Sequence, residues 1–273
     1  MFAECLNNVR AKSPLVHNIT NYVTVNDVAN ILLACGGSPI MADAPEEAAD
    51  ITSICNGLNI NIGTLNERTV RAMHLAGKKA ADLGHPIVLD PVGAGASRYR
   101  TETAAGLVDA LPLAAIRGNV SELKALALGS TATKGVDAAA ADAVTEDNLE
   151  EMVCFTKEYA RSAQCIVAIT GAIDLVADEK ICYVIRNGRA EMGRITGTGC
   201  QLSGLLTAYL AANPKAPLAA AAAAVCLMGL AGQIGWEHRQ PGDGNAAYRS
   251  RIIDAVYHMT ASRLEEGADY EIR

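Results

Sequence analysis

The sequence has few aromatic residues and no cluster of basic ones. Its 273 residues include 1 Trp, 2 Phe and 8 Tyr, and 30 Asp and Glu outnumber 23 Lys and Arg, so the formal net charge is −7. Proteins that bind nucleic acids combine basic surfaces with aromatic side chains on which bases stack. Both features are missing here, so we expect no nucleic-acid partner.

Zinc-binding motifs and a secretory signal are also missing. The eight cysteines form no C-x-x-C pair, and no histidine pair at helical spacing accompanies them, so a zinc site has no support. The first residues, Met1 to Cys5, lack the basic and then apolar pattern of a secretory signal. We therefore expect a cytoplasmic protein with reduced thiols and no membrane contact.

One uncharged run has the length of a membrane span. It extends from Leu218 to Trp236 and includes six consecutive alanines. Alanine contributes little to transfer into lipid, and Gly229, Gly232 and Gly235 dilute the run further. Because no basic segment flanks it, the run predicts a helix buried on all sides within the fold.

The rest of the sequence alternates between helical and strand patterns. Helices are expected from 25 to the glycines at 36 and 37, from about 45, and over about 66–83, 101–111, 121–128 and 146–163. Strands are expected at 39–42, 58–62, 87–89, 113–116 and 166–169, and 174–177 with 181–187 should form a hairpin. Residues 129–145 resemble a loop, and the chain after Gly199 is almost wholly helical.

This alternation predicts the architecture of the chain. Short apolar strands between helices are typical of a mainly parallel sheet whose two faces are covered by helices. No repeat of fixed period and no linker rich in Pro, Ser or Gly interrupts the sequence. We therefore expect an α/β fold in which residues 1–273 form a single domain.

A glycine turn, Thr196 to Cys200, precedes the helical pattern that follows it. Small residues at the start of a helix leave its first N–H groups open to an anion. Taken alone, the turn is better explained as a tight bend beside a buried cysteine. No Lys-Ser/Thr follows it, and its spacing is not that of a dinucleotide fingerprint.

Three further polar segments follow predicted strands. Asp90 ends the strand at 87–89 and enters a glycine loop, Asn119 and Glu122 follow the strand at 113–116, and Thr170 follows 166–169. Asn119 with Glu122 matches a helix cap and its N3 acid, although Glu122 could instead hold Mg²⁺ through water. Since the carboxyl ends of parallel strands meet at one edge of a sheet, the four loops should converge. Together they offer the groups that phosphoryl transfer needs.

Amides are dense around His17, at Asn18, Asn21, Asn26 and Asn30. Some of these should cap the helix that follows. For His17, burial with backbone partners is the better interpretation than a catalytic role.

The segments described above resemble the hydroxyethylthiazole kinase family of the ribokinase-like superfamily. The matching stretches are HNITNYVTVNDVAN (17–30), PIMADAPEE (39–47), NIGTL (61–65), VLDPVGAGAS (88–97), RGNVSEL (117–123), ITG (169–171) and TGTGC (196–200). The resemblance implies ATP-dependent, Mg²⁺-assisted phosphorylation of the hydroxyl of 4-methyl-5-(2-hydroxyethyl)thiazole, in thiamine biosynthesis or salvage. It also implies a ribokinase-like fold without a lid domain, and a homotrimer that binds thiazole near the contact between subunits.

The resemblance also implies a role for each site residue. The implied thiazole contacts are Met41, Gly197, Asn21 and Gly63, the implied ATP contacts are Arg117, Asn119 and Thr170, and the implied Mg²⁺ carboxylates are Asp90 and Glu122. Ribokinase-like enzymes generally have an Asp base after the glycine turn, whereas this chain has Cys200, as thiazole kinases usually do. Cys200 is therefore the catalytic candidate, and its position at a helix start is expected to lower the pKa of its thiol.

Three alternative functions compete with this interpretation. The chain could phosphorylate another heterocyclic alcohol such as hydroxymethylpyrimidine, although HNITN and TGTGC weigh against this. Cys200 could be the nucleophile of an acyl-transfer enzyme, but none of the five histidines stands in a loop suited to be its partner. A nucleotide-binding regulator without catalysis would need no carboxylate pair at the phosphate.

Overall fold

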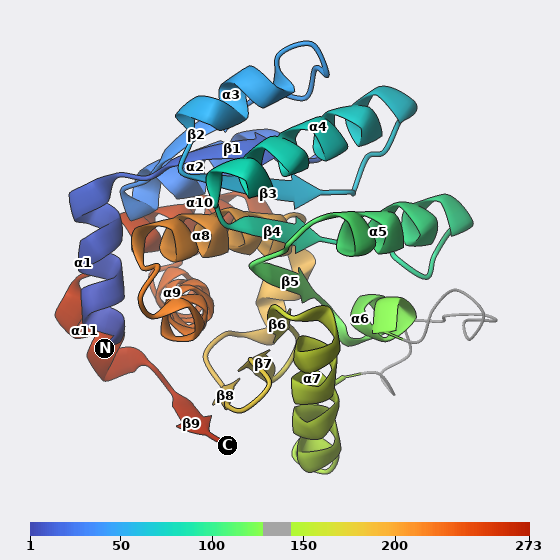
Figure 1. Cartoon of the computed structure of the whole chain (residues 1–273). Helices are drawn as coiled ribbons and strands as arrows, with labels where there is room; N and C mark the ends of the chain where they lie inside the picture. Colours follow the sequence, from blue (N-terminus) through green and yellow to red (C-terminus); the bar gives the residue numbers. More distant parts are fainter. Residues whose placement is uncertain (128–142) are drawn as a thin grey trace.

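The computed structural model describes residues 1–127 and 143–273, which are built around one nine-stranded sheet (Figure 1). The strand order is β2-β1-β3-β4-β5-β6-β7-β8-β9. Neighbouring strands from β2 to β6 pair in parallel, and β7, β8 and β9 extend the sheet with antiparallel pairs. The strands are β1 (Leu15–Ile19), β2 (Ser38–Met41), β3 (Gly57–Asn61), β4 (Ile87–Asp90), β5 (Ala115–Gly118), β6 (Ile166–Ile169), β7 (Asp174–Ala177), β8 (Cys182–Ile185) and β9 (Tyr270–Ile272).

Helices cover both faces of the sheet (Figure 1). One face packs against α1 (Phe2–Lys12), α2 (Val25–Cys35), α8 (Thr198–Ala212), α9 (Pro217–Glu237), α10 (Asn245–Tyr257) and α11 (Ala261–Gly267). The other packs against α3 (Ala48–Ile54), α4 (Glu67–Leu83), α5 (Arg98–Ala110), α6 (Val120–Ala127) and α7 (Leu149–Ala163). A short 3-10 helix, η2 (Ala190–Arg194), lies between β8 and α8.

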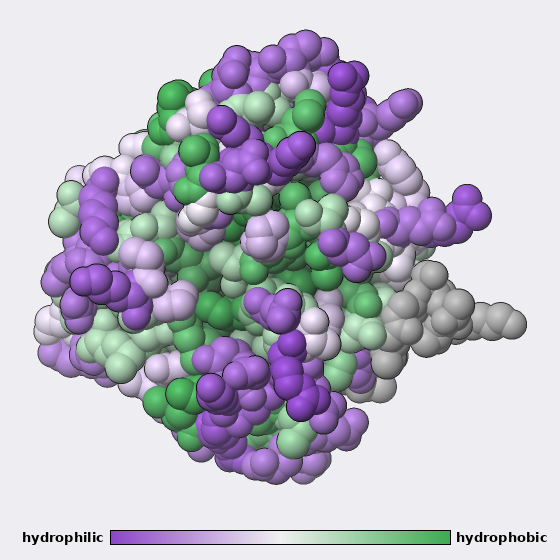
Figure 2. All heavy atoms as spheres, in the orientation of Figure 1, coloured by the Kyte–Doolittle hydropathy of each residue, from purple (hydrophilic) through white to green (hydrophobic). Residues whose placement is uncertain are grey.

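The two core layers follow from the alternation of side chains along each strand. In β4, Val88 belongs to the cluster under α8 and α9, whereas Ile87 and Leu89 belong to the cluster under α3 to α7. Because successive side chains point to opposite faces of a sheet, a continuous apolar strand supplies both cores at once. Figure 2 shows apolar residues gathered across the middle of one side of the molecule, over the central strands, with polar residues around them.

Helix α9 is long and apolar enough to cross a membrane by length and composition, yet 89% of its apolar window is buried inside the fold. All of its alanines from Ala219 to Ala224 are buried. This confirms the prediction of a helix packed on all sides.

The predicted alternation of strands and helices is confirmed, with differences at a few elements. The expected strands appear as β2 to β6 and the expected hairpin as β7 and β8, while α3 begins at Ala48 and not near Pro45. Strands β1 and β9 and helix α1 were not predicted. Within the described residues every strand belongs to the one sheet, in agreement with the expected absence of a separate lid. Most of the loop predicted at 129–145 lies outside the described residues.

Candidate active site

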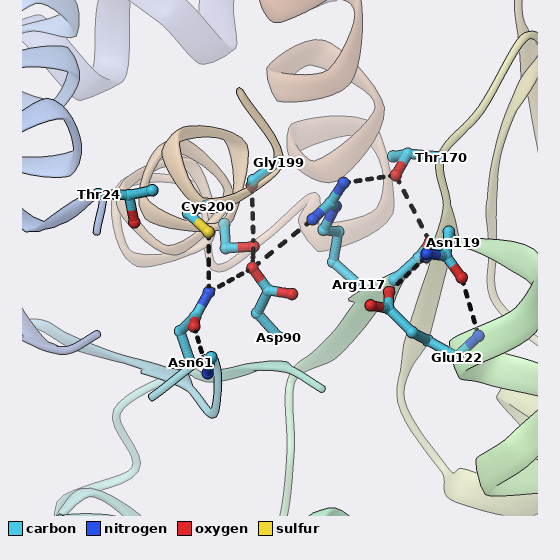
Figure 3. Close-up of polar contacts among 12 residues, drawn as sticks. Thr24, Asn61, Asp90, Arg117, Asn119, Glu122, Thr170, Gly199 and Cys200 are labelled. Atoms are coloured by element: carbon cyan, nitrogen blue, oxygen red, sulfur yellow. Dashed lines mark hydrogen bonds and ion pairs between the residues drawn. The ribbon is translucent and has the colours of Figure 1, made fainter. Parts of the chain in front are cut away.

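The predicted loops converge at the carboxyl edge of the parallel strands, where Arg117 links three of them (Figure 3). Its Nη1 atom lies 3.6 Å from Oδ2 of Asp90 at the end of β4, and its Nη2 donates to Oγ1 of Thr170 after β6, at 2.6 Å. The Arg117 side chain is only 12% exposed. A nearly buried guanidinium beside a carboxylate can also bind an anion such as phosphate.

Asp90 is a fully buried carboxylate with one oxygen left free of hydrogen bonds. Its Oδ2 accepts hydrogen bonds from Nδ2 of Asn61 at 2.7 Å and from Oγ of Ser203 at 2.8 Å, whereas Oδ1 has no partner. Burial raises the pKa of Asp90 to about 6, with a further contribution from the nearby negative charge of Glu122, while Arg117 opposes the rise. Oδ1 is therefore a buried acceptor whose capacity for hydrogen bonds is not used.

The side-chain amide of Asn61 connects Asp90 with Cys200. Its Nδ2 lies 3.2 Å from Sγ of Cys200, while its Oδ1 accepts from Nδ2 of Asn21 at 3.0 Å and from the N–H of Gly63 at 2.9 Å. The bond from Gly63 fixes which end of the Asn61 amide faces Asp90. A Cβ atom on Gly63 would lie 2.8 Å from Nδ2 of Asn21, so this contact requires a glycine. Asn21 therefore lies beside the thiol, and Gly63 lies beside Asn21.

Cys200 lies in the first turn of α8, and its thiol differs from the prediction. Sγ is also 3.1 Å from Nδ2 of Asn21, and the side chain is buried. Burial, followed by the negative charge of Asp90, raises the pKa of Cys200 and outweighs the hydrogen bonds of Thr24 and Asn21. The expectation of a lowered pKa at the helix start was therefore wrong, because desolvation by the surrounding core dominates.

Glu122 forms the helix cap that the sequence offered as one of two interpretations. Its Oε2 accepts from the N–H of Asn119 at 2.9 Å, and Oδ1 of Asn119 accepts from the N–H of Glu122 at 2.8 Å. Its Oε1 accepts from the N–H of Gly93 at 2.8 Å. Glu122 thus fastens the start of α6 to the loop that follows Asp90.

The carboxylates fit a magnesium ion only in part. Among the described residues no group of three or more His, Cys, Asp or Glu side chains could enclose a metal. Mg²⁺ at phosphate sites is commonly held by one or two carboxylates together with phosphate and water. The unpaired Oδ1 of Asp90 and the second lone pairs of the Glu122 oxygens supply ligands of that kind.

The glycine turn before α8 brings Arg117 against the start of the helix. Gly197 has φ +89, and a Cβ atom there would lie 2.5 Å from Cγ2 of Thr24. A Cβ atom on Gly199 would lie 2.4 Å from Nη1 of Arg117. An anion at this helix start would therefore meet both free N–H groups and the guanidinium.

A cavity of about 530 Å³ opens beside Arg117, within the size range of small-molecule sites. One end is formed by residues of the converging loops, and the other by the segment 187–193 and helix α9. The residues at the first end are Arg117, Asn119, Thr170, Gly171, Ala172, Asp174, Thr198 and Gly199. All three implied ATP contacts therefore line this one cavity.

Met41 lies at the same sheet edge but at its margin. It is the last residue of the edge strand β2, where it pairs with Asn18 of β1, and the residue is 36% exposed. Tyr22 and Val23, from the loop after β1, are 61% and 66% exposed, and the hydroxyl of Tyr22 donates to Asp43 at 2.9 Å. Large apolar side chains are thus exposed beside the implied thiazole residues.

Sequence reasoning missed Asn61, Ser203 and Thr24 as site residues. Asn61 is the first residue of the NIGTL stretch, and Ser203 follows Cys200 by three residues on α8. Their positions in or near the motifs could therefore have indicated both residues. The prediction for His17 is confirmed. Its ring nitrogens lie 2.9 Å from Oγ1 of Thr52 and 2.7 Å from the carbonyl oxygen of Ala42, and it is fully buried.

Comparisons with known proteins agree with this geometry. The model of the hydroxyethylthiazole kinase family matches residues 6–262. A hydroxyethylthiazole kinase of Clostridium acetobutylicum is 53% identical over 271 residues, which cover 99% of each chain. A hydroxyethylthiazole kinase structure from Pyrococcus horikoshii is 34% identical, with a TM-score of 0.88 over 100% of this chain and 98% of that one.

A more distant structure shares the ribokinase-like fold alone. The pyridoxal kinase of Staphylococcus aureus in complex with AMP-PCP and pyridoxal has a TM-score of 0.63 at 14% identity, over 95% of this chain and 98% of that one. The family match, in contrast, extends over nearly the whole chain at substantial identity. The chain belongs to the hydroxyethylthiazole kinase family.

Proposed function

We propose that this chain transfers the γ-phosphoryl group of ATP to the hydroxyl of 4-methyl-5-(2-hydroxyethyl)thiazole, in thiamine biosynthesis or salvage. The observation that carries the proposal is the position of Arg117. Its guanidinium lies between Asp90, Thr170 and the start of α8, where the cavity meets the polar cluster around Cys200. A transferring phosphoryl group needs cationic and N–H donors at this kind of junction.

The phosphate chain of ATP is assigned to the end of the cavity formed by the converging loops. Arg117, Asn119 and Thr170 line it, together with Thr198 and Gly199 at the start of α8. Phosphoryl transfer is catalysed mainly by positioning and by stabilisation of charge, which these groups can supply without covalent chemistry.

Asp90 and Glu122 are the residues that would hold Mg²⁺. When bound, the ion would neutralise part of the charge of the phosphates. The chain's own contribution is to keep Asp90 ionisable in a buried place, through the donors Asn61 and Ser203 and the nearby charge of Arg117. Glu122 in turn fixes the loop that carries Asp90.

The thiazole alcohol is assigned to the side of Cys200 on which Asn21 lies, and Gly63, Gly197 and Met41 are proposed as its further contacts. Because the pKa of Cys200 is raised, its thiol is protonated at neutral pH. We assign it as a hydrogen-bond partner of the reacting hydroxyl, and no covalent intermediate forms on it. As the bond from the hydroxyl oxygen to the γ-phosphorus forms, the bond from that phosphorus to ADP breaks, and in a loose transition state the hydroxyl proton leaves late, to an oxygen of the transferred phosphoryl group. A neutral thiol therefore suffices as a partner.

The active species is proposed to be a cytoplasmic homotrimer in which residues 1–273 act as one kinase domain. Exposed apolar residues support the assembly, because Tyr22 and Val23 lie in the same loop as Asn21 and project from the fold. Exposed apolar patches commonly mark protein contacts. A neighbouring subunit at this place would complete the thiazole site beside Met41.

The test is an assay of ATP consumption with three acceptor conditions: the thiazole alcohol, hydroxymethylpyrimidine, and no acceptor. We expect turnover with the thiazole alcohol that exceeds the other two by at least about 10²-fold, because only one acceptor matches a site of fixed shape and polarity. Faster turnover of the pyrimidine alcohol would refute the proposal, and so would a rate of ATP consumption that is the same with and without an acceptor.

A further inference from the structure

Arg100, in the first turn of α5, connects two of the loops that meet at the site. Its Nη1 donates to the carbonyl oxygen of Val92, in the loop after β4, at 2.8 Å. Its Nη2 donates to the carbonyl oxygen of Gly63, in the loop after β3, also at 2.8 Å. Strands β3 and β4 are parallel neighbours in the sheet, and Figure 1 shows α5 beside the end of β4. We call these two hydrogen bonds the Arg100 bridge.

In the loop after β4, the Arg100 bridge fits closely against Gly93. This residue has φ +74, and a Cβ atom on it would lie 2.5 Å from Nη1 of Arg100. Its N–H donates to Oε1 of Glu122 at 2.8 Å. Both the left-handed backbone and the close guanidinium require a glycine at this position. The loop that follows Asp90 is therefore held between Arg100 and Glu122.

In the loop after β3, both backbone polar groups of Gly63 have partners. Its carbonyl oxygen accepts from Arg100, and its N–H donates to Oδ1 of Asn61 at 2.9 Å. The amide nitrogen of Asn61 in turn lies 2.7 Å from Oδ2 of Asp90 and 3.2 Å from Sγ of Cys200. The Arg100 bridge thus reaches the polar cluster around the thiol through only two residues, Gly63 and Asn61.

The guanidinium projects from a helix start that is itself held in place. The N–H of Arg100 donates to Oγ of Ser97 at 3.3 Å. Oγ1 of Thr101 donates to the carbonyl oxygen of Ser97 at 2.9 Å and accepts from the N–H of Gly95 at 2.8 Å. Side-chain caps of this kind stabilise the first turn of a helix. A planar guanidinium on such a base can hold two carbonyl oxygens in one arrangement, whereas a lysine ammonium is a single point charge.

We propose that Arg100 is a positioning residue for phosphoryl transfer, which holds the loop of Gly63 against the loop after Asp90 and so fixes the acceptor alcohol relative to the phosphoryl group. Arg100 is not among the residues that line the cavity beside Arg117, so it acts through the two loops and not by contact with the nucleotide. The inference rests on the proposed function, in which Gly63 is assigned to the alcohol and Asp90 to the phosphate side. Reacting atoms must be closely aligned, and a misplacement of about 1 Å can slow an enzyme by about 10²-fold.

The test compares Arg100→Lys with Arg98→Lys, because both changes keep the positive charge but only the first removes the fork that joins the loops. Arg98 begins the same helix, its side chain is 86% exposed, and its Nε lies 3.5 Å from Oε1 of Glu102. With saturating ATP and thiazole alcohol, Arg100→Lys should lower kcat by at least about tenfold, while the KM for ATP stays within about twofold. Arg98→Lys should leave both quantities within about twofold. Thermal melting of each variant measures whether a lower rate comes from a smaller folded fraction.

Hydrogen exchange followed by mass spectrometry examines the loops without turnover. In Arg100→Lys, amide exchange should become at least about fivefold faster in peptides that cover residues 62–65 and 91–96, because the two loops are no longer held to each other. The peptide that covers Thr170, in the loop after β6, should exchange as in the unaltered chain. In Arg98→Lys all three regions should be unchanged.

Unchanged exchange in both loops of folded Arg100→Lys, or a kcat within about twofold of the unaltered chain, would overturn the inference. Should Arg100→Lys fail to fold, Arg100→Gln places a shorter planar amide at the same position and should show the same two changes. If the loops exchange faster but the unaltered chain does not phosphorylate the thiazole alcohol, the proposed function fails and the Arg100 bridge between the loops stands. If the alcohol is phosphorylated and exchange in the loops does not change, this inference alone fails.

Discussion

The thiol of Cys200 shows how one side chain can keep its place in a motif while its chemistry is set by its surroundings. Two amide groups, from Asn21 and Asn61, lie within hydrogen-bond distance of Sγ, and burial beside Asp90 raises the pKa of the thiol. A helix start alone would favour the thiolate. Here the lost solvation is the larger effect, so the neutral form prevails at physiological pH.

Replacement of this thiol tests its role. If Cys200 acts as a neutral hydrogen-bond partner worth about 1 kcal/mol, Cys200→Ala should lower kcat by roughly fivefold. Loss of a general base would lower kcat by about 10²–10⁴-fold, and the loss of a covalent nucleophile would leave only residual activity. Steady-state rates with saturating ATP and thiazole alcohol distinguish these cases. Intact mass should show no phosphorylated cysteine, and its detection would contradict the assignment.

The buried carboxylate of Asp90 should lower the free energy of unfolding at neutral pH, although the proposed function needs it. Its pKa is about 6 in the fold, against an unfolded value of about 3.9. Since the folded state holds this proton more tightly, the free energy of unfolding should fall as pH rises from about 4 to 6. Asp90→Asn removes this loss, so we expect it to be more stable than the unaltered chain at pH 7.5, by roughly 1–3 kcal/mol.

Denaturant unfolding of both proteins between pH 4 and pH 7.5 measures this difference. The gain should shrink towards zero near pH 4, where the carboxyl group is protonated in the folded state and about half protonated in the unfolded state. Activity of the variant should fall by more than about 10²-fold. The opposite result would be a variant that is less stable than the unaltered chain at pH 7.5 but not at pH 4. It would show that the ion pair of Asp90 with Arg117 stabilises the fold by more than burial of the carboxylate destabilises it.

At the scale of elements, the start of α6 joins a helix cap to the site. Asn119 and Glu122 follow the spacing of a capping box, which is why the sequence could predict it. The second oxygen of Glu122 reaches Gly93, in a loop that is 29 residues away in the sequence. That contact arises only when β4 and β5 pair, so no local pattern could have indicated it.

Glu122→Gln tests both functions of this side chain. An amide has one oxygen, so the N–H of either Gly93 or Asn119 loses its acceptor, and stability should fall by about 1 kcal/mol. If Glu122 also serves the metal and the phosphates, kcat should fall by at least about 10²-fold at saturating ATP and Mg²⁺. Glu67→Gln, in the first turn of α4, is the control, because the cap of α4 is formed by Asn66 and Thr69. Equal effects on stability and rate would support a role in capping alone.

The strands that could be predicted from the sequence and the strand β1, which could not, differ in how their polar side chains are arranged. Strands β4 and β6 are nearly continuous apolar runs, which predicts a strand buried on both faces, whereas in β3 leucine and isoleucine alternate with asparagines. Strand β1 contains His17 and Asn18, and these polar residues left no apolar run from which a strand could be predicted. Both are buried and have partners from other segments, including Thr52 and Asn59. A buried polar strand can be predicted only when its partners are known.

The convergence of the site was predictable because parallel strands have one carboxyl edge. Asp90, Arg117 and Thr170 each follow a strand, and the structure joins them through the guanidinium. The pKa of Cys200 and the hydrogen bonds of Asn61 were not predictable, since they depend on which groups become desolvated together. Which loops meet at the site can therefore be predicted from the sequence, whereas the pKa values and hydrogen bonds of the site depend on the packing of the folded chain.

At the scale of the whole molecule, the proposed trimer gives a reason for the apolar residues that project near the thiazole side. Val23 and Tyr22 lie in the loop that also carries Asn21, and Met41 ends the neighbouring strand. The residues that line the cavity beside Arg117, where the nucleotide is proposed to bind, do not include these three apolar side chains. Disruption of the assembly should therefore damage the two substrate sites unequally.

Val23→Asp places a charge in the proposed contact, where burial of an unpaired charge is costly. Sedimentation at assay concentration should give about three times the 28.5 kDa chain mass for the unaltered protein and close to one chain for the variant. The KM for the thiazole alcohol should rise by at least about tenfold, while the Kd for ADP stays within about twofold. Ile181→Asp, an exposed position at the β7–β8 turn, should change neither quantity and controls for added charge. A monomer that retains full activity would contradict the trimer, because it would show that one chain holds the whole thiazole site.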